Sequence, residues 1–152
     1  MRAITITSAV SVPAGSFTLP GAASGAKVRV PAFCHVAATV NKEVRIELWM
    51  PRQWNRKLLA VGNVGSAGSI VYPPMVKPLK RGYATSSTCT GQQAGSTTDG
   101  DWALGNYERI VNFSDRATRL MAEADRLILN HSTARNPPVP ISADAHEGAT
   151  RQ

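Results

Sequence analysis

Three closely spaced glycines follow a short apolar run, and the sequence could support chemistry at this turn. The run covers residues 57–61, and the turn reads G-N-V-G-S-A-G, with glycines at positions 62, 65 and 68. A strand that stops at such glycines exposes backbone N–H groups at the carboxyl edge of a sheet, where open α/β folds bind ligands. An N–H held in a tight turn can stabilise a developing oxyanion. From the turn alone, simple chain reversal is the competing and favoured interpretation.

Few other side chains offer a nucleophile or a metal site. Ser66 lies in the turn, but Val64 stands where a G-x-S-x-G motif needs its first glycine, and nothing in the sequence places a base beside the serine. Asp99 and Asp101 are close enough to bind a cation, yet one pair of loop carboxylates supplies too few oxygens for calcium. We therefore expect solvated loop acids, no metal and no cofactor.

The histidines and cysteines are scattered along the chain. His35 follows Cys34 beside a predicted strand and is expected to be structural. His131 ends a predicted helix, where a cation suits the negative end of the helix dipole. His146 lies in the segment D-A-H-E-G. Cys34 and Cys89 could pair, although two cysteines make neither a disulfide scaffold nor a zinc site, so we expect one buried and one free thiol.

Length and composition restrict the class of protein. The chain has 152 residues, 43% hydrophobic and 18% charged, which fits one modest globular domain. It has no apolar run of about 18 residues, and its first residues lack the apolar core of a secretory signal, so we expect no membrane contact and a cytoplasmic location. The formal charge is +7, but only Tyr83 lies near the densest basic group (Lys77, Lys80 and Arg81). We therefore expect no nucleic-acid binding.

Alternating and continuous apolar residues predict the strands that position the turn. The predicted strands cover residues 3–12, 27–30, 36–40, 44–49, 57–61 and 82–88, with a further short strand at 139–141. Asn41 and Lys42 are expected to connect two of them as a hairpin. Residues 90–101 read as a polar loop.

Two segments are candidates for helices. Three prolines between residues 73 and 78 allow at best a short, broken helix after the glycine turn. A stripe of apolar residues at three- and four-residue spacing predicts a helix from about residue 115 to 130. Ser114 is its expected cap, and Arg119 and Glu123 are an expected ion pair. Strands interleaved with helices in this order indicate an α/β fold.

Several motifs also occur in the order found in one enzyme family. They are P-A-F-C-H-V-A-A-T-V (31–40), R-I-E-L-W-M-P-R-Q-W-N-R-K-L-L-A-V-G-N-V-G-S-A-G-S (45–69), R-G-Y-A-T-S-S-T (81–88), D-W-A-L-G (101–105) and R-A-T-R-L-M (116–121). Each is weak alone, but the ordered set resembles the amino-terminal part of the tannase and feruloyl esterase family. The resemblance implies an α/β-hydrolase fold with a large inserted lid and cleavage of plant phenolic esters by Ser, Asp and His in chain order.

The resemblance also assigns site residues. Gly65 matches the glycine whose backbone N–H is one oxyanion donor. The segment D-A-H-E-G matches a nucleophile elbow that reads G-C-S-x-G in the family, so His146 occupies the serine position and Glu147 would supply the second oxyanion N–H. An imidazole there cannot replace a serine that is acylated with the help of a separate histidine base. The family's T-D-T-G-H reads T-C-T-G-Q here, ending at Gln92, and its cysteine beside the serine is replaced by Ala145.

The resemblance therefore implies a single incomplete α/β-hydrolase-like domain over residues 1–152, without the lid and the carboxyl-terminal part. We expect an inactive amino-terminal portion of an ester hydrolase, with a small phenolic ester as its ligand if it has one. The alternative is a small non-catalytic binding protein derived from the hydrolase fold. A shortened sheet has an exposed edge, through which such a chain could self-associate.

Overall fold

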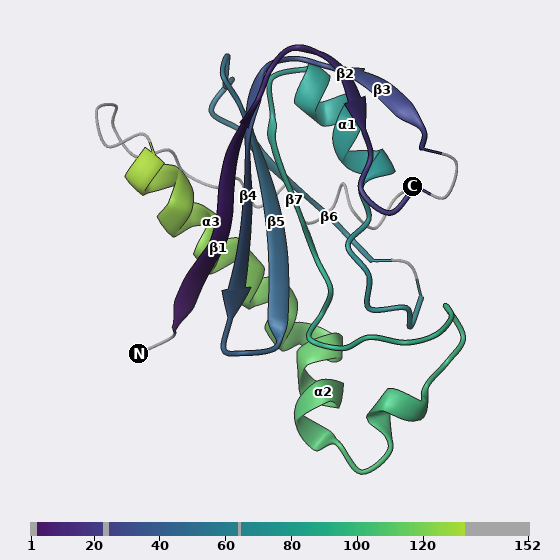
Figure 1. Cartoon of the computed structure of the whole chain (residues 1–152). Helices are drawn as coiled ribbons and strands as arrows, with labels where there is room; N and C mark the ends of the chain where they lie inside the picture. Colours follow the sequence, from purple (N-terminus) through teal and green to yellow (C-terminus); the bar gives the residue numbers. More distant parts are fainter. Residues whose placement is uncertain (1–2, 23–24, 64, 133–152) are drawn as a thin grey trace.

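The computed structural model describes residues 3–22, 25–63 and 65–132 (Figure 1). The strands of this part are β1 (Ile4–Val12), β2 (Gly15–Thr18), β3 (Lys27–Val30), β4 (Phe33–Val40), β5 (Val44–Pro51), β6 (Leu58–Val61) and β7 (Ala84–Thr88). The helices are α1 (Pro73–Lys80), α2 (Tyr107–Val111) and α3 (Ala117–Ser132), with a short 3-10 helix at Asp101–Ala103 and a π-helical turn at Asn112–Arg116. The predicted strand at 139–141 lies outside the described residues.

The main sheet is mixed and has the strand order β1-β4-β5-β7-β6. Its first four strands pair antiparallel, whereas β6 and β7 pair parallel and are connected through α1. The hairpin predicted at Asn41 and Lys42 is present, and both residues have a positive φ. β2 was not predicted, because Pro13 and Gly15 read as a break; it pairs with β3 in a separate two-stranded sheet. The predicted α/β class is confirmed.

The proline-rich segment after the glycine turn forms the short helix that its sequence allows. Pro73 and Pro74 occupy the first helical positions, where the N–H that proline lacks would have no partner in any case. Pro78 lies inside the helix, which ends two residues later. Gly82 follows with φ +83°, a left-handed conformation that suits glycine. The prolines and Gly82 therefore limit α1 to about two turns, and this short helix connects the parallel strands β6 and β7.

The long helix begins earlier than predicted. α2, the π-helical turn and α3 follow one another from Tyr107 to Ser132. The side-chain oxygen of Asn106 caps this run by accepting a hydrogen bond from Arg109 N at 3.2 Å. Ser114 lies inside the π-helical turn and donates from Oγ to the carbonyl oxygen of Val111. The predicted Ser114 cap is therefore wrong, because a helical turn precedes the serine and supplies an acceptor for its hydroxyl.

The two faces of the sheet are covered by different elements (Figure 1). On one face, α3 packs Leu120 and Ala124 against Val40 and Ile46. On the other face, α1 and the β2–β3 hairpin enclose a cluster around the fully buried Trp49. Complete burial of one large apolar side chain stabilises the fold by about 1.5–3 kcal/mol. The sheet, which includes the ends of β6 and β7, is therefore held between α3 on one face and α1 with the β2–β3 hairpin on the other.

None of the helices in the described ranges is long and apolar enough to cross a lipid bilayer.

Candidate functional site

The glycine turn begins where β6 ends, and its backbone requires glycine at two positions. Gly65 has φ +51° and Gly68 has φ +58°, both in the left-handed region. A Cβ atom on Gly65 would lie 2.6 Å from the carbonyl oxygen of Thr97. A Cβ atom on Gly68 would lie 2.3 Å from the carbonyl oxygen of Gln92. Backbone conformation and lack of space thus independently exclude a side chain at both positions.

The loop after β7 holds this turn in place through three hydrogen bonds. Ser66 N donates to Thr97 O at 2.8 Å, and Ala94 N donates to Ala67 O at 3.1 Å. Gln92 Nε2 donates to Ser66 O at 3.1 Å, and this glutamine is buried. Because the contacts come from both backbone and side chain, the turn is fixed before any ligand arrives.

The backbone N–H of Gly65 differs from that of Ser66 in its hydrogen bonding. Among the described residues, no oxygen accepts a hydrogen bond from Gly65 N–H, whereas Ser66 N–H is used by Thr97. The Gly65 carbonyl accepts from Asn63 Nδ2 at 3.4 Å. Gly65 is also an exposed residue. Glu147 and His146, the other two predicted site residues, lie outside the described residues.

A small cavity adjoins the turn at the carboxyl ends of the two parallel strands. Its volume is about 50 Å³, and it is lined by Ala60, Val61, Gly62, Asn63, Thr88, Thr90, Thr118 and Met121. Four of these residues carry a hydroxyl or amide group, and Asn63 Nδ2 reaches Thr90 Oγ1 at 3.3 Å. A cavity of this size holds one or two water-sized groups. It lies at the edge where α/β folds place reacting groups.

The other candidates for chemistry are explained by their contacts. The side chain of Ser66 forms no hydrogen bond with a histidine or carboxylate of the described residues, so the structure brings no base to it. His131 Nδ1 lies 3.0 Å from Leu127 O in the last turn of α3, at the helix end where a cation was expected. Cys34 is half-buried and Cys89 is buried, and both are free thiols.

The two loop aspartates organise backbone rather than gather metal ligands. The carboxylate of Asp99 accepts from Asp101 N and from Gly95 N, each at 3.0 Å. The bond from Asp101, followed by that from Gly95, lowers the pKa of Asp99. Within the part of the chain that the structure describes, no three His, Cys, Asp or Glu side chains are placed to hold a metal ion.

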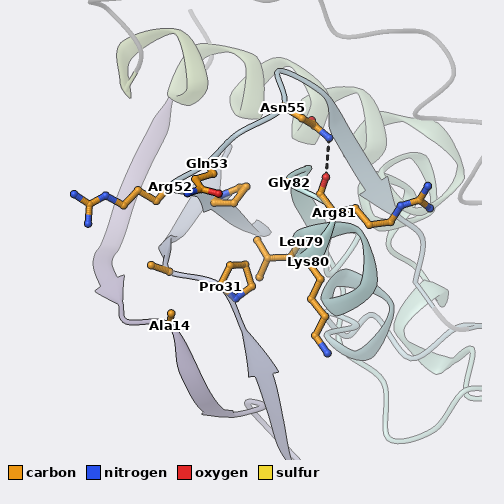
Figure 2. Close-up of a pocket in the computed structure, with 11 residues that line it drawn as sticks. Ala14, Pro31, Arg52, Gln53, Asn55, Leu79, Lys80, Arg81 and Gly82 are labelled. Atoms are coloured by element: carbon orange, nitrogen blue, oxygen red, sulfur yellow. Dashed lines mark hydrogen bonds between the residues drawn. The ribbon is translucent and has the colours of Figure 1, made fainter.

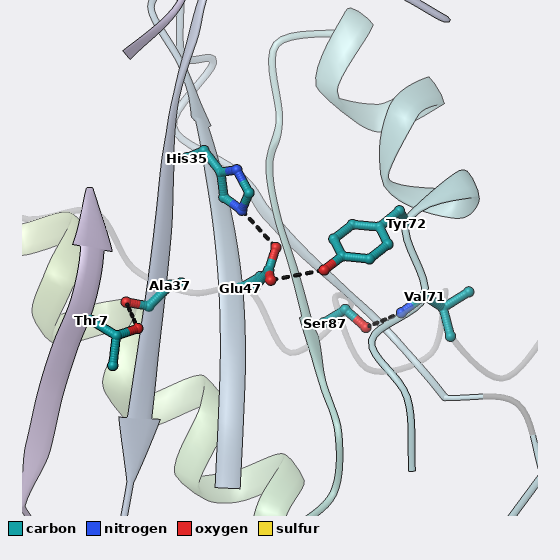
Figure 3. A network of polar contacts seen from close by, with 7 residues as sticks. All are labelled: Thr7, His35, Ala37, Glu47, Val71, Tyr72 and Ser87. Carbon is teal, nitrogen blue, oxygen red and sulfur yellow. Dashed lines mark hydrogen bonds and ion pairs between the residues drawn. The ribbon is translucent and has the colours of Figure 1, made fainter. Parts of the chain in front are cut away.

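A polar network fixes the segment that leaves the glycine turn (Figure 3). Tyr72 OH donates to Glu47 Oε1 at 2.8 Å, and His35 Nε2 lies 2.6 Å from Glu47 Oε2. Burial, then the hydrogen bond to Glu47, raises the pKa of Tyr72. Next to it, Val71 N donates to Ser87 Oγ at 3.1 Å. His35 therefore has a structural partner, as predicted, and the network anchors the start of α1 to β4, β5 and β7.

Sequence reasoning did not identify this network, although its signal was available. Alternation along the hairpin places His35, Glu47 and Trp49 on one face, and the register pairs His35 with Trp49 and Ala37 with Glu47. Two polar residues on a face that also carries tryptophan indicate a buried polar contact.

A buried carboxyl group was also missed. Asp125 of α3 is completely buried, and in the described structure no donor reaches either of its oxygens with hydrogen-bond geometry. Burial raises its pKa to about 8, and the nearby hydroxyl of Ser86 offsets the rise only in part. Its place on the apolar stripe, beside Ala124, is the sequence signal that was overlooked.

Comparison with known proteins supports the fold and identifies the family. The family model described as "Tannase and feruloyl esterase" matches residues 27–141. An uncharacterized esterase of Xanthomonas campestris pv. campestris is 36% identical over 139 residues, which cover 88% of this chain and 23% of that protein. A probable feruloyl esterase B-1 of Aspergillus terreus is 28% identical over 97 residues, covering 61% of this chain and 18% of that protein.

The same relationship appears in three dimensions. The crystal structure of feruloyl esterase B from Aspergillus oryzae superposes with a TM-score of 0.69 and 26% identity, covering 81% of this chain and 26% of that one. The fold is thus part of an α/β-hydrolase-like domain. This chain spans about a quarter of the length of such relatives or less.

Proposed function

Because this chain belongs to the tannase and feruloyl esterase family, we propose that it builds the oxyanion-binding side of a carboxylic ester hydrolase. The observation that carries the proposal is the Gly65 N–H, which faces no acceptor in the described structure and sits in a turn clamped by the loop after β7. A fixed donor costs no reorganisation when charge develops on the ester carbonyl oxygen. Such a donor typically stabilises the transition state by about 3–4 kcal/mol.

The reaction we propose is hydrolysis of a phenolic ester through an acyl-enzyme, since two of the relatives are named as feruloyl esterases. A serine hydroxyl adds to the ester carbonyl carbon, and its proton passes to a histidine. The tetrahedral oxyanion is held by Gly65 N–H and by a second N–H, for which Glu147 is the candidate. The alcohol then leaves with the proton, and water releases the phenolic acid.

We also propose that these 152 residues alone do not hydrolyse esters. The ground is the identity of residue 146, since the resemblance aligns this histidine with the serine of the nucleophile elbow. The test is turnover of methyl ferulate, methyl gallate and p-nitrophenyl acetate by the chain and by its Ser66→Ala variant. No turnover above buffer is expected from either protein. Turnover that Ser66→Ala abolishes would make Ser66 the nucleophile and contradict the proposal.

A chimaera tests the oxyanion side separately from the elbow. In it, residues 27–132 replace the matching segment of feruloyl esterase B from Aspergillus oryzae, and that enzyme supplies the remaining three quarters of the chain. We expect hydrolysis of methyl ferulate with kcat within about tenfold of the parent. A folded, monodisperse chimaera without activity would show that the segment does not support the reaction.

The second candidate is the non-catalytic binding protein, and one observation favours it. Among the described strands, β6 pairs only with β7, so the outer edge of β6 has no strand beside it. Unpaired edges associate with other strands. Analytical ultracentrifugation over a range of concentrations tests the use of this edge: reversible dimers support self-association through β6, and a monomer at all concentrations removes it.

A further inference from the structure

A groove lies away from the glycine turn, at the opposite end of α1 (Figure 2). Its volume is about 510 Å³, and it runs between the β3–β4 connection and the carboxyl end of α1. Ala14, Pro31 and Ala32 provide accessible apolar surface above the buried Pro51 and Leu79, and Arg52, Lys80 and Arg81 provide three cations. No aspartate or glutamate lines it. The size is that of many small ligand sites, but the charge is of one sign.

The walls of this groove are fixed by hydrogen bonds. Asn55 N donates to Gly82 O at 2.8 Å, and Asn55 Nδ2 donates to Arg81 O at 3.0 Å. On the other side, Arg52 N donates to Ala32 O at 2.9 Å. The turn after β5 is thereby attached both to the end of α1 and to the strand connection. The groove is formed before any partner binds, which lowers the entropic cost of binding.

The three cations of the groove have no acidic partner in the described structure, in contrast to three arginines that lie elsewhere. Arg109, Arg116 and Arg119 each form an ion pair with a carboxylate. In the described ranges, Arg52, Lys80 and Arg81 form none, although all three are exposed. The groove therefore carries uncompensated positive charge, to which an anionic partner is complementary.

The arrangement of the charges decides between one anion and several. Figure 2 shows the charged ends of Arg52, Lys80 and Arg81 fanning away from one another around the groove. They do not converge, so a single carboxylate or phosphate cannot contact all three. A linear partner with repeated negative charges can. Because the accessible apolar lining between them is alanine and proline, and no aromatic ring lines the groove, it suits apolar side chains better than sugars or bases.

We propose that this groove binds an extended acidic peptide segment, with glutamate or aspartate side chains on the rim cations and apolar side chains against Ala14, Pro31 and Ala32. The site is independent of ester hydrolysis, because it lies at the end of α1 remote from the glycine turn. Long-range attraction to the net charge of +7 speeds such an encounter but does not select the groove.

The test is fluorescence anisotropy with the full chain and a labelled, terminally blocked heptapeptide that alternates glutamate with leucine or proline. The same peptide with lysine in place of glutamate is the charge control. The Arg52→Glu, Lys80→Glu double variant should raise the Kd at least tenfold. A matched Lys42→Glu, Arg126→Glu variant changes the net charge equally at exposed positions outside the groove and should raise Kd at most about threefold.

Three results would overturn the proposal. The first is equal binding of the glutamate and lysine peptides. The second is an equal loss of binding in the two double variants, which would mean that only the net charge matters. The third is stronger competition by polygalacturonate than by unlabelled peptide when both are compared at equal concentrations of negative charge. That result would identify a polysaccharide site. Circular dichroism of both variants confirms that they are folded like the parent chain.

Discussion

The side-chain amide of Gln92 donates to the carbonyl oxygen of Ser66 at 3.1 Å and thereby joins the loop after β7 to the glycine turn after β6. The same glutamine leaves no room for a side chain on Gly68, since its carbonyl oxygen lies 2.3 Å from the Cβ position. Gln92 thus both holds the turn by a hydrogen bond and requires glycine at position 68. The geometry around Gly65 depends on this contact.

Replacing Gln92 with alanine should loosen the turn. The Ser66 carbonyl loses its donor, and such a loss costs about 1–3 kcal/mol of unfolding free energy in a buried setting. Urea unfolding of Gln92→Ala measures the loss. Gln93→Ala is the matched control, because Gln93 is exposed, and its stability should be unchanged. Equal midpoints for the two variants would mean that Gln92 does not hold the turn.

Alanine at Gly68 should be far more damaging than alanine at Gly105. Both glycines have similar positive φ, +58° and +66°, so the conformational cost of about 1–2 kcal/mol is shared. Only Gly68 also meets neighbouring atoms, because nothing lies within 4 Å of the Cβ position of Gly105. Thermal unfolding should show a moderate loss for Gly105→Ala and a much larger loss or no folding for Gly68→Ala. Similar losses of thermal stability in the two variants would contradict the predicted steric clash at Gly68.

Asp125 should make the protein less stable as the pH rises. Its pKa is 3.8 in the unfolded chain and about 8 in the folded one, so between these values the folded state keeps a proton that the unfolded state releases. Stability therefore falls from about pH 4 to about pH 8, by at most about 1.4 kcal/mol per pH unit. Asp125→Asn has no such titration, and its chemical-denaturation profile should be flatter over this range. Identical profiles would contradict a neutral buried carboxyl group.

Removing the Tyr72 hydroxyl should weaken the attachment of α1. Tyr72→Phe keeps the ring stacked on Trp49 but deletes the hydrogen bond to Glu47, at a cost of about 1–2 kcal/mol. Tyr107→Phe is the control, because Tyr107 is 74% exposed. We expect urea to unfold the Tyr72 variant first and the control together with the parent. No difference between the variants would mean that water replaces the hydroxyl without cost.

The sequence predicted most elements of the sheet because its strands have strong local signals. Alternation along residues 44–49 and the continuous apolar run in residues 57–61 both became strands. The start of the long helix was missed because Ser114 and Asp115 imitate a start signal, while the true cap, Asn106, precedes residues with little apolar periodicity. Local sequence signals therefore predicted the type of each element better than its boundaries.

The site was predictable only in part, because its contacts join distant segments. The need for glycine at positions 65 and 68 follows from Thr97 and Gln92, which are 32 and 24 residues away in sequence, respectively. Periodicity identifies faces of strands and helices but not which loop lies over which turn. The resemblance supplied Gly65 as a candidate, whereas the clamp, the Tyr72 network and the buried Asp125 required three-dimensional packing.

Amide hydrogen exchange of Gly65 and Ser66, followed by NMR on the whole chain, tests the central claim most directly. A turn that presents one donor outward should leave the Gly65 amide exchanging at the rate of an unprotected peptide, while the Ser66 amide, bonded to Thr97 O, is protected by at least about tenfold. Protection of Gly65 equal to that of Ser66 would contradict the account, because its N–H would then be occupied within the protein.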